Sequence, residues 1–286
     1  MSESRADAER LKSEQRSVWD AAAAGWKKWW PIFEHSAQHV SDRLVELTGI
    51  GPGARVLDIA TGNGEPAVTA ARRVAPNGRV IATDQSAGML AIARERAAAL
   101  GVTNVEFRET DGETLALDER DFDAVVCRWG MMFMPDFAAA VRGIHERLRP
   151  GGRFATAVWS TFDRVPMISI GAMAVRELAG LPPPPPDALE PTRLADPARL
   201  TTALADSGFS EITVERLGVT FEFDSPAAFT QFRREVAAPF RALLERQTPA
   251  MRQRILDAVT NAARECLTPE GKVRTTNETI LFAARR

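Results

Sequence analysis

One stretch of this sequence, 56-VLDIATGNGEPA-67, combines residue types and spacings that favour ligand binding. Its apolar run contains Asp58, and Gly62 and Gly64 follow a few residues later. From Gly62 to Ala67 the letters match G-x-G-x-x-A, a dinucleotide-binding pattern whose glycines let the backbone turn tightly and approach a ligand. Many loops match this pattern, so the neighbouring acids have to separate the candidate ligands.

Those acids favour a cationic ligand over a pyrophosphate, which prefers bare N–H groups with no acid close by. Asp58 ends the first predicted strand and Glu65 opens the next helix. Asp84 ends the second strand, 20 residues after Gly64, which suits a carboxylate that accepts two ribose hydroxyls. Asp111 follows the third strand. The loop therefore favours S-adenosylmethionine, which carries an ammonium and a sulfonium group.

The segments that position these acids alternate between strand-like and helix-like patterns. This alternation predicts parallel βαβ units, and in such a sheet ligands bind beyond the carboxyl ends of the strands. We expect an α/β fold with a doubly wound, mostly parallel, seven-stranded, Rossmann-like sheet and a helical cap. The strands are expected at 55–60, 79–84, 104–109, 122–128, 153–159, 211–218 and 277–285, and the helices between the first five at 65–75, 86–100 and 136–148.

Further helical segments flank this core. They are predicted at 3–24, 31–47, 164–180 and 197–207, with two more across 226–268, and the prolines at 182–186 predict a stiff polyproline connector. The expected domains are an N-terminal helical cap at 1–50, a ligand-binding core at 51–162, substrate-cap insertions at 163–210 and 225–270, and C-terminal strands at 211–224 and 271–286 that complete the sheet.

Composition excludes several classes of protein. The chain has 286 residues, 45% apolar and 26% charged, which are ordinary globular values. Its net charge of -2 offers no basic field for nucleic acid. No apolar run approaches the roughly 20 residues of a membrane span, and no signal-peptide pattern follows the polar N-terminus. Cys127 and Cys266 lie far apart in sequence, which fits a reducing compartment, so we expect a cytoplasmic protein.

Five motifs occur in a characteristic order: VLDIATGNGEPA, GRVIATDQSAGMLAIARERA, VEFRETDGETL, FDAVVCRWGMMFMPD and LRPGGRFATAVW. Together they resemble class I S-adenosylmethionine-dependent methyltransferases, in particular the ubiquinone/menaquinone-biosynthesis type and its small-molecule relatives. The resemblance covers about residues 18–160, and the remainder resembles the family's variable cap only loosely. The family's commonest loop has glycine where this chain has Ala60, which predicts altered packing without loss of binding.

The resemblance implies S-adenosylmethionine as cofactor, with S-adenosylhomocysteine as product, and assigns a role to each matched position. The first loop would line the methionine end, Asp84 would hold the ribose, Met89 would border the adenine, and Arg128 would flank the methionine through its backbone. The expected cofactor-binding residues are Asp58, Ala60, Gly62, Gly64, Asp84, Gln85, Met89, Asp111, Gly112, Arg128 and Trp129.

Methyl transfer mainly requires alignment of the acceptor, and a base helps only when the acceptor must lose a proton. His35 and His39 are four residues apart, hence on one helical face, and are the candidate catalytic residues. No third metal ligand follows, so we expect no metal. Aromatic and methionine side chains predict an apolar pocket for an apolar or aromatic acceptor, with O- or C-methylation favoured: Trp29, Trp30, Phe33, Met132, Phe133 and Trp159, with Met167, Phe229, Phe232 and Phe240 in the cap.

Two other functions remain open at this stage. An NAD(P)-dependent oxidoreductase would need a Tyr-Lys pair or a similarly placed acid, yet the chain has no tyrosine and no lysine between Lys28 and Lys272. A non-methylating enzyme, such as a cyclase, could keep the same fold and cofactor. The expected partners are a small-molecule acceptor and, in a homodimer, a second copy of the chain, with no nucleic acid and no membrane span.

Overall fold

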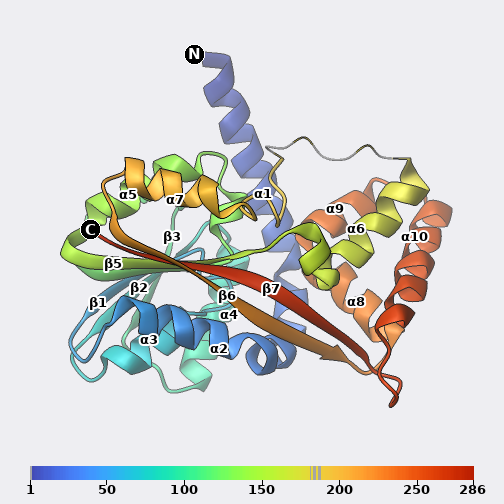
Figure 1. Ribbon diagram of the computed structural model, residues 1–286, viewed down its shortest axis with the longest axis horizontal. Helices are drawn as coiled ribbons and strands as arrows, with labels where there is room; N and C mark the ends of the chain where they lie inside the picture. The colour runs from blue at the N-terminus through green and yellow to red at the C-terminus, as the bar shows by residue number, and fades with distance from the viewer. Residues whose placement is uncertain (1, 181, 183–184, 186–187) are drawn as a thin grey trace.

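The structure is a computed structural model that describes residues 2–180, 182, 185 and 188–286 (Figure 1). Side chains are described from residue 10 onward. The polyproline connector predicted at 182–186 falls largely outside the described residues.

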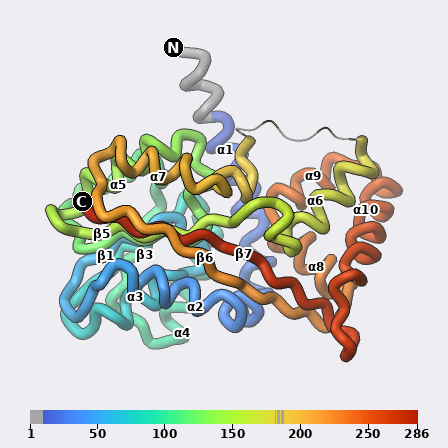
Figure 2. Tube along the Cα trace, viewed as in Figure 1, coloured from blue at the N-terminus to red at the C-terminus, as the bar shows by residue number. Residues whose placement is uncertain are grey.

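The predicted seven-stranded, mostly parallel sheet is confirmed. Its strands lie in the order β3-β2-β1-β4-β5-β7-β6, and β7 runs antiparallel to both of its neighbours. Figure 2 shows β6 and β7 running side by side. The order reverses between β1 and β4, which places a ligand crevice at the carboxyl ends of these two strands. The strands are β1 (Arg55–Ile59), β2 (Arg79–Asp84), β3 (Val105–Glu109), β4 (Phe122–Arg128), β5 (Leu148–Trp159), β6 (Ser210–Phe223) and β7 (Val273–Arg285).

Helices cover both faces of the sheet, which explains why β1 and β4 are buried almost throughout. Figure 1 shows α5 (Phe137–Arg147) and α7 (Pro197–Asp206) on one face, and α2 (Trp30–Thr48), α3 (Ala67–Val74) and α4 (Ala87–Ala99) on the other. The α7 helix packs on α5 and β6, hence on the sheet.

The remaining helices gather beside the sheet and form the cap. They are α1 (Ser2–Lys28), α6 (Pro166–Ala179), α8 (Pro226–Val236), α9 (Ala238–Glu245) and α10 (Pro249–Ala262) (Figure 1). The prediction of two helices across 226–268 is wrong, since three α-helices and a short 3-10 turn occupy it. Pro239 and Pro249 each lie in the first turn of a new helix, because proline cannot donate the hydrogen bond that would continue the previous one.

Three strands are longer than predicted. The β5 strand begins at Leu148 and not at residue 153, so Pro150 and the two glycines that follow it lie within the strand. The β6 and β7 strands pair from Ser210–Arg285 to Phe223–Val273 and carry the sheet edge toward the cap.

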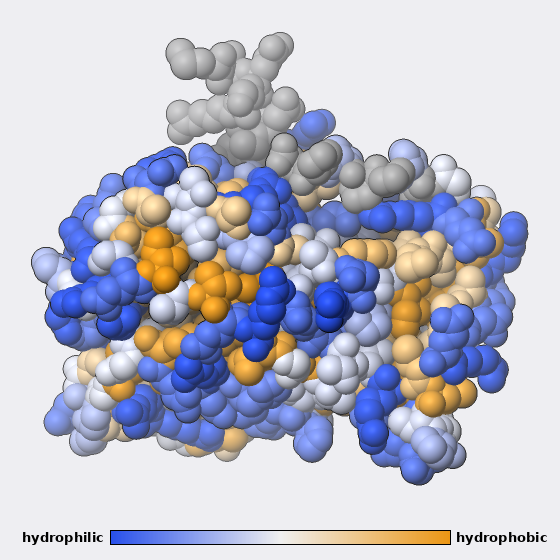
Figure 3. All heavy atoms as spheres, in the orientation of Figure 1, coloured by the Kyte–Doolittle hydropathy of each residue, from blue (hydrophilic) through white to orange (hydrophobic). Residues whose placement is uncertain are grey.

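Most large apolar side chains are buried, and the face drawn in Figure 3 is mostly hydrophilic with scattered apolar patches. One large cluster of buried side chains continues from the sheet into the cap, for example from Phe221 of β6 to Phe232 of α8. Among the side chains that the structure describes, the exposed large apolar ones are Leu11, Leu100, Met173, Val214 and Leu267.

The α1 helix docks closely on α8, and Gly25 permits this contact. A Cβ atom at Gly25 would lie 2.1 Å from the backbone oxygen of Glu235, whereas one at Gly143 in α5 would meet nothing closer than 3.7 Å. Because both glycines are helical, alanine raises helix propensity equally at the two sites. We expect Gly25→Ala to be less stable than Gly143→Ala by about 2 kcal/mol, measured by urea denaturation, and to expose α1 to limited proteolysis. Equal stabilities of the two variants would contradict this docking.

Candidate functional site

A cavity of about 420 Å³ lies at the carboxyl ends of the parallel strands, beneath the cap helices, α1 included. It has the size and location typical of a small-molecule site in an open α/β sheet. Nine of the eleven predicted cofactor-binding residues line it: Ala60, Gly62, Asp84, Gln85, Met89, Asp111, Gly112, Arg128 and Trp129.

The glycine loop after β1 turns through left-handed backbone conformations. Ala60, Gly62 and Gly64 have φ values of 55°, 56° and 98°. Glycine adopts such angles freely, whereas alanine does so at a cost of about 1–2 kcal/mol. Ala60 therefore keeps the backbone turn that a glycine would favour. Its Cβ packs against Gly130, and a Cβ atom added to Gly130 would lie only 2.5 Å from it.

The Asp84 carboxylate holds this loop. Its Oδ2 accepts the N–H of Gly62 at 2.9 Å, and its Oδ1 accepts the N–H of Ser86, also at 2.9 Å. Desolvation by the surrounding protein raises the pKa of Asp84 to about 6, although these backbone N–H groups oppose the rise. The residue lines the cavity, so it can both orient the loop and accept ligand hydroxyls.

Asp58 lies beneath the loop, and neither it nor Gly64 lines the cavity. Asp58 Oδ2 accepts the N–H of Ala67 at 3.0 Å, while its Oδ1 has no hydrogen-bond partner. Burial raises the pKa of Asp58 to about 8. The hydroxyl of Thr61 and the amide nitrogen of Asn63 are also buried without partners, and both residues line the cavity. Polar atoms left unsatisfied around a glycine loop fit the amino-acid end of S-adenosylmethionine.

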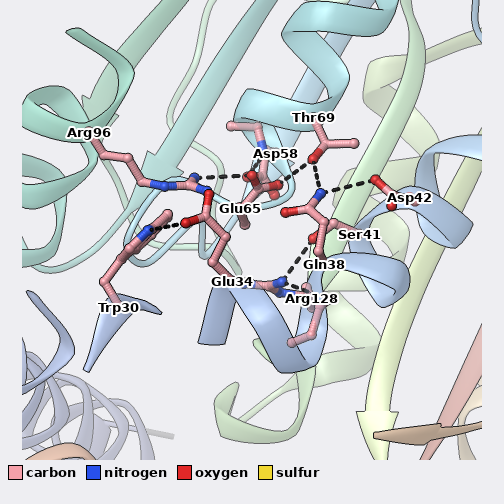
Figure 4. A network of polar contacts seen from close by, with 12 residues as sticks. Trp30, Glu34, Gln38, Ser41, Asp42, Asp58, Glu65, Thr69, Arg96 and Arg128 are labelled. Atoms are coloured by element: carbon pink, nitrogen blue, oxygen red, sulfur yellow. Dashed lines mark hydrogen bonds and ion pairs between the residues drawn. The ribbon is translucent and has the colours of Figure 1, made fainter. Parts of the chain in front are cut away.

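A buried ion pair supports the loop from below (Figure 4). Glu65 Oε1 lies 3.0 Å from Nη1 of Arg96 in α4, and both side chains are less than a tenth exposed. Glu65 Oε2 accepts the hydroxyl of Thr69, which in turn accepts from Gln38 of α2. The Arg96 guanidinium lies 3.1 Å from the ring centroid of Trp30. Glu65 is therefore already paired with a cation, and its charge is not free to attract the ligand.

The α1 helix covers the side of the cavity where the adenine is expected. Lys12 pairs with Asp111 at 2.7 Å and with Glu113 at 2.5 Å, and Asp20 accepts from the Ser86 hydroxyl at 2.5 Å. Sequence reasoning missed Lys12, Gln15, Trp19 and Trp26, which all line the cavity. Their helical spacing, i, i+3, i+7 and i+14, was the available signal, because it places them on one face.

Three of the six predicted acceptor-pocket residues, Phe33, Phe133 and Trp159, line the cavity. The other three do not. Trp29 donates its Nε1–H to Glu235 at 2.6 Å, Trp30 packs on Arg96, and Met132 is fully buried in the core. In the cap, Met167, Phe232 and Phe240 line the cavity, whereas Phe229 is buried away from it.

The histidine prediction needs correction. His35 and His39 lie on the exposed face of α2 and do not line the cavity, and His39 Nε2 lies 2.9 Å from the backbone oxygen of Gly218. The buried face of α2 instead carries Phe33 and Ala37 inward, so four-residue spacing placed both histidines together but on the wrong side.

Among the described residues, no group of three or more His, Cys, Asp or Glu side chains could hold a metal ion. No helix within the described ranges has the length and apolar character needed to cross a membrane.

The fold and cavity define a Rossmann-like ligand-binding protein, and comparisons with known proteins identify its family. A methyltransferase-domain model matches residues 56–152. The chain is 35% identical over 135 residues to the ubiquinone/menaquinone biosynthesis C-methyltransferase UbiE of Pseudomonas putida, covering 47% of this chain and 49% of that protein. The UbiE sequence of Ectopseudomonas oleovorans is 34% identical, covering 47% of this chain and 74% of that protein.

Among solved structures, phosphoethanolamine N-methyltransferase 2 of Haemonchus contortus, in complex with phosphomonomethylethanolamine and S-adenosylhomocysteine, has a TM-score of 0.59. Its sequence identity is 18%, and the match covers 95% of this chain and 59% of that one, which shows a shared fold. The chain belongs to the class I S-adenosylmethionine-dependent methyltransferases, of the ubiquinone/menaquinone C-methyltransferase type. It spans about half the length of the first Pseudomonas relative.

The Glu65–Arg96 pair yields a stability prediction. Glu65→Gln leaves Arg96 buried with only the more exposed Glu34 as ion-pair partner, so we expect a loss of about 3 kcal/mol in the free energy of unfolding. The double variant Glu65→Gln, Arg96→Met removes the stranded charge and should recover part of that loss. A double-mutant cycle by urea denaturation measures the coupling, and strictly additive effects would show that the pair contributes nothing.

Proposed function

We propose that this protein transfers the methyl group of S-adenosylmethionine to a carbon or oxygen atom of a small apolar or aromatic acceptor. One observation carries the proposal: a single cavity joins the glycine loop and Asp84 to apolar side chains of α1 and the cap. The UbiE relatives are named as C-methyltransferases, which supports carbon as the methylated atom.

The cofactor, when bound, supplies the methyl group and the leaving sulfur. The chain's own residues bind and orient it: Asp84 accepts the ribose hydroxyls, and backbone N–H groups of the loop meet the amino-acid end. Trp19 and Trp26 of α1 cover the cavity and exclude water from the reacting atoms. Alignment of the acceptor in such a covered site is the main source of rate enhancement.

The cavity lining constrains the acceptor. Its apolar side chains, such as Phe33, Trp159 and Phe240, favour a flat or lipophilic molecule. No histidine is among the described residues that line the cavity, so an acceptor that must lose a proton would pass it to a lining carboxylate or to water. A net charge of -2 supports a small-molecule acceptor over nucleic acid.

Calorimetric titration tests the cofactor assignment. We expect micromolar binding of S-adenosylmethionine and S-adenosylhomocysteine, and no binding of NADH. Asp84→Ala removes the ribose acceptor and the loop's hydrogen bond, so binding should weaken at least a hundredfold. Asp257→Ala, on the exposed face of α10, is the matched control and should bind normally. Tight NADH binding, or Asp84→Ala affinity equal to wild type, would overturn the proposal.

The affinity for S-adenosylhomocysteine should also depend on pH. Asp84 has a pKa of about 6 in the free protein, and only the ionised carboxylate accepts both ribose hydroxyls. Binding should therefore be strongest above pH 7 and fall as the pH is lowered through 6, approaching tenfold per pH unit below it. Titrations at pH 5.0 to 8.0 measure this slope. Asp84→Asn, which has no proton to lose, should bind weakly with a flatter profile, and an unchanged slope in this variant would assign the titration to another group.

A further inference from the structure

Arg233 of α8 is a buried charge in the wall of the cavity. The residue is 7% exposed and lines the cavity from the cap helix α8. Burial lowers the pKa of its guanidinium to about 10, which still leaves it positively charged at pH 7. A charged group in this position is costly unless something compensates it.

No such compensation is found among the described residues. Arg233 Nε is buried without a hydrogen-bond partner, and no carboxylate of the described chain lies within ion-pair distance of the guanidinium. Two acids of nearby elements are already engaged: Glu190 with Arg176 at 3.4 Å, and Glu235 with Lys28 at 2.8 Å.

The surroundings hold the guanidinium in place without neutralising it. Its Cζ lies 5.6 Å from the ring centroid of Phe240, a cation–π contact. The guanidinium also lies beside Gly171 of α6, where a Cβ atom would be 3.4 Å from Arg233 Nε, an ordinary contact distance. The neighbouring cavity wall is apolar, with Met167, Ile168 and Val236. A positioned cation in an apolar pocket binds an anion strongly, because water does not screen it.

We propose that Arg233 binds a carboxylate of the acceptor, distinct from the methylated atom, so that the substrates are apolar or aromatic acids. This inference rests on the proposed methyl transfer. It adds a negatively charged group to the acceptor, which the apolar cavity lining alone does not predict. The acid's apolar body lies along the cap side chains, and its carboxylate accepts hydrogen bonds from the guanidinium. Arg233 thereby sets specificity and orients the acceptor.

Matched acid and amide probes test this assignment. Protein saturated with S-adenosylhomocysteine is titrated calorimetrically with three pairs: benzoate and benzamide, 3-phenylpropionate and 3-phenylpropanamide, and 2-naphthoate and 2-naphthamide. In at least one pair the carboxylate should bind about tenfold to a hundredfold more tightly than the amide. Arg233→Met should abolish this preference, Arg233→Lys should retain part of it, and Arg234→Met, on the exposed side of the same helix, should leave it intact.

Two further readouts separate specificity from a structural role. Arg233→Met removes an unpaired buried charge, so its Tm should equal or exceed that of wild type, and its affinity for S-adenosylhomocysteine should be unchanged. Loss of that affinity would mean that Arg233 binds the cofactor's own carboxylate, and a lowered Tm would mean that it supports the cap; either result overturns the inference. Equal affinities for acid and amide, or no binding of any carboxylate, also overturn it. Absence of S-adenosylhomocysteine binding by wild type would instead defeat the proposed function itself.

Discussion

The buried ion pair between Glu65 and Arg96 joins the parts of the molecule on which the site depends. Glu65 belongs to the glycine loop, Arg96 to α4, and their further partners Thr69, Glu34 and Trp30 connect α3 and α2 to the same network (Figure 4). A buried pair contributes to stability only when its remaining donors and acceptors are also satisfied. Here most of them are, so the loop is oriented before any ligand arrives.

This network changes the electrostatic argument that the sequence suggests. The sequence offers four acids for the ligand, Asp58, Glu65, Asp84 and Asp111, yet Glu65 is paired with Arg96 and Asp111 with Lys12. Asp58 lies below the cavity wall and its pKa is raised by burial. Asp84 is therefore the acid best placed to contact a ligand in the cavity, and the N–H groups of Gly62 and Ser86 orient its carboxylate. The preference for S-adenosylmethionine therefore depends on the position of the Asp84 carboxylate more than on the summed negative charge of the four acids.

The cap uses charge differently. Its helices come from both ends of the chain, and Glu235 of α8 bonds to Lys28, the last residue of α1, and to Trp29, which follows it. Within this otherwise apolar half, Arg233 remains uncompensated by the described residues. The Glu65–Arg96 pair thus neutralises two buried charges of the core, whereas the cap leaves the Arg233 guanidinium at the cavity without an ion-pair partner among the described residues. The cavity therefore presents a carboxylate, Asp84, from the core and a cation, Arg233, from the cap.

Local patterns determined the sheet and much of its ligand-binding edge. Alternation of short apolar runs with helical segments specifies parallel pairing, and the residues at strand ends then meet at one edge whatever the details of packing. Ala60, Gly62 and Asp84 could be placed for this reason. Helix boundaries set by proline, as at Pro239, were also present in the sequence but were not recognised.

Tertiary structure decided what depends on contacts between distant segments. The α2 helix buries the face that carries Phe33, so Phe33 lines the cavity and His39 does not. Helical spacing shows which residues share a face, but not whether that face packs against the rest of the protein. The pairing of Trp30 with Arg96 and of Lys12 with Asp111 joins residues far apart in the chain. Arg233 is unremarkable in sequence, one of two adjacent arginines, and only the packing of α6 and α9 around it makes it a buried, unpaired cation. The sequence by itself determined the sheet and the glycine loop, because both follow from local periodicity and from the conformational freedom of glycine. The tertiary structure decided which charged side chains are neutralised and which face the ligand, because burial and ion pairing arise only when distant segments pack together.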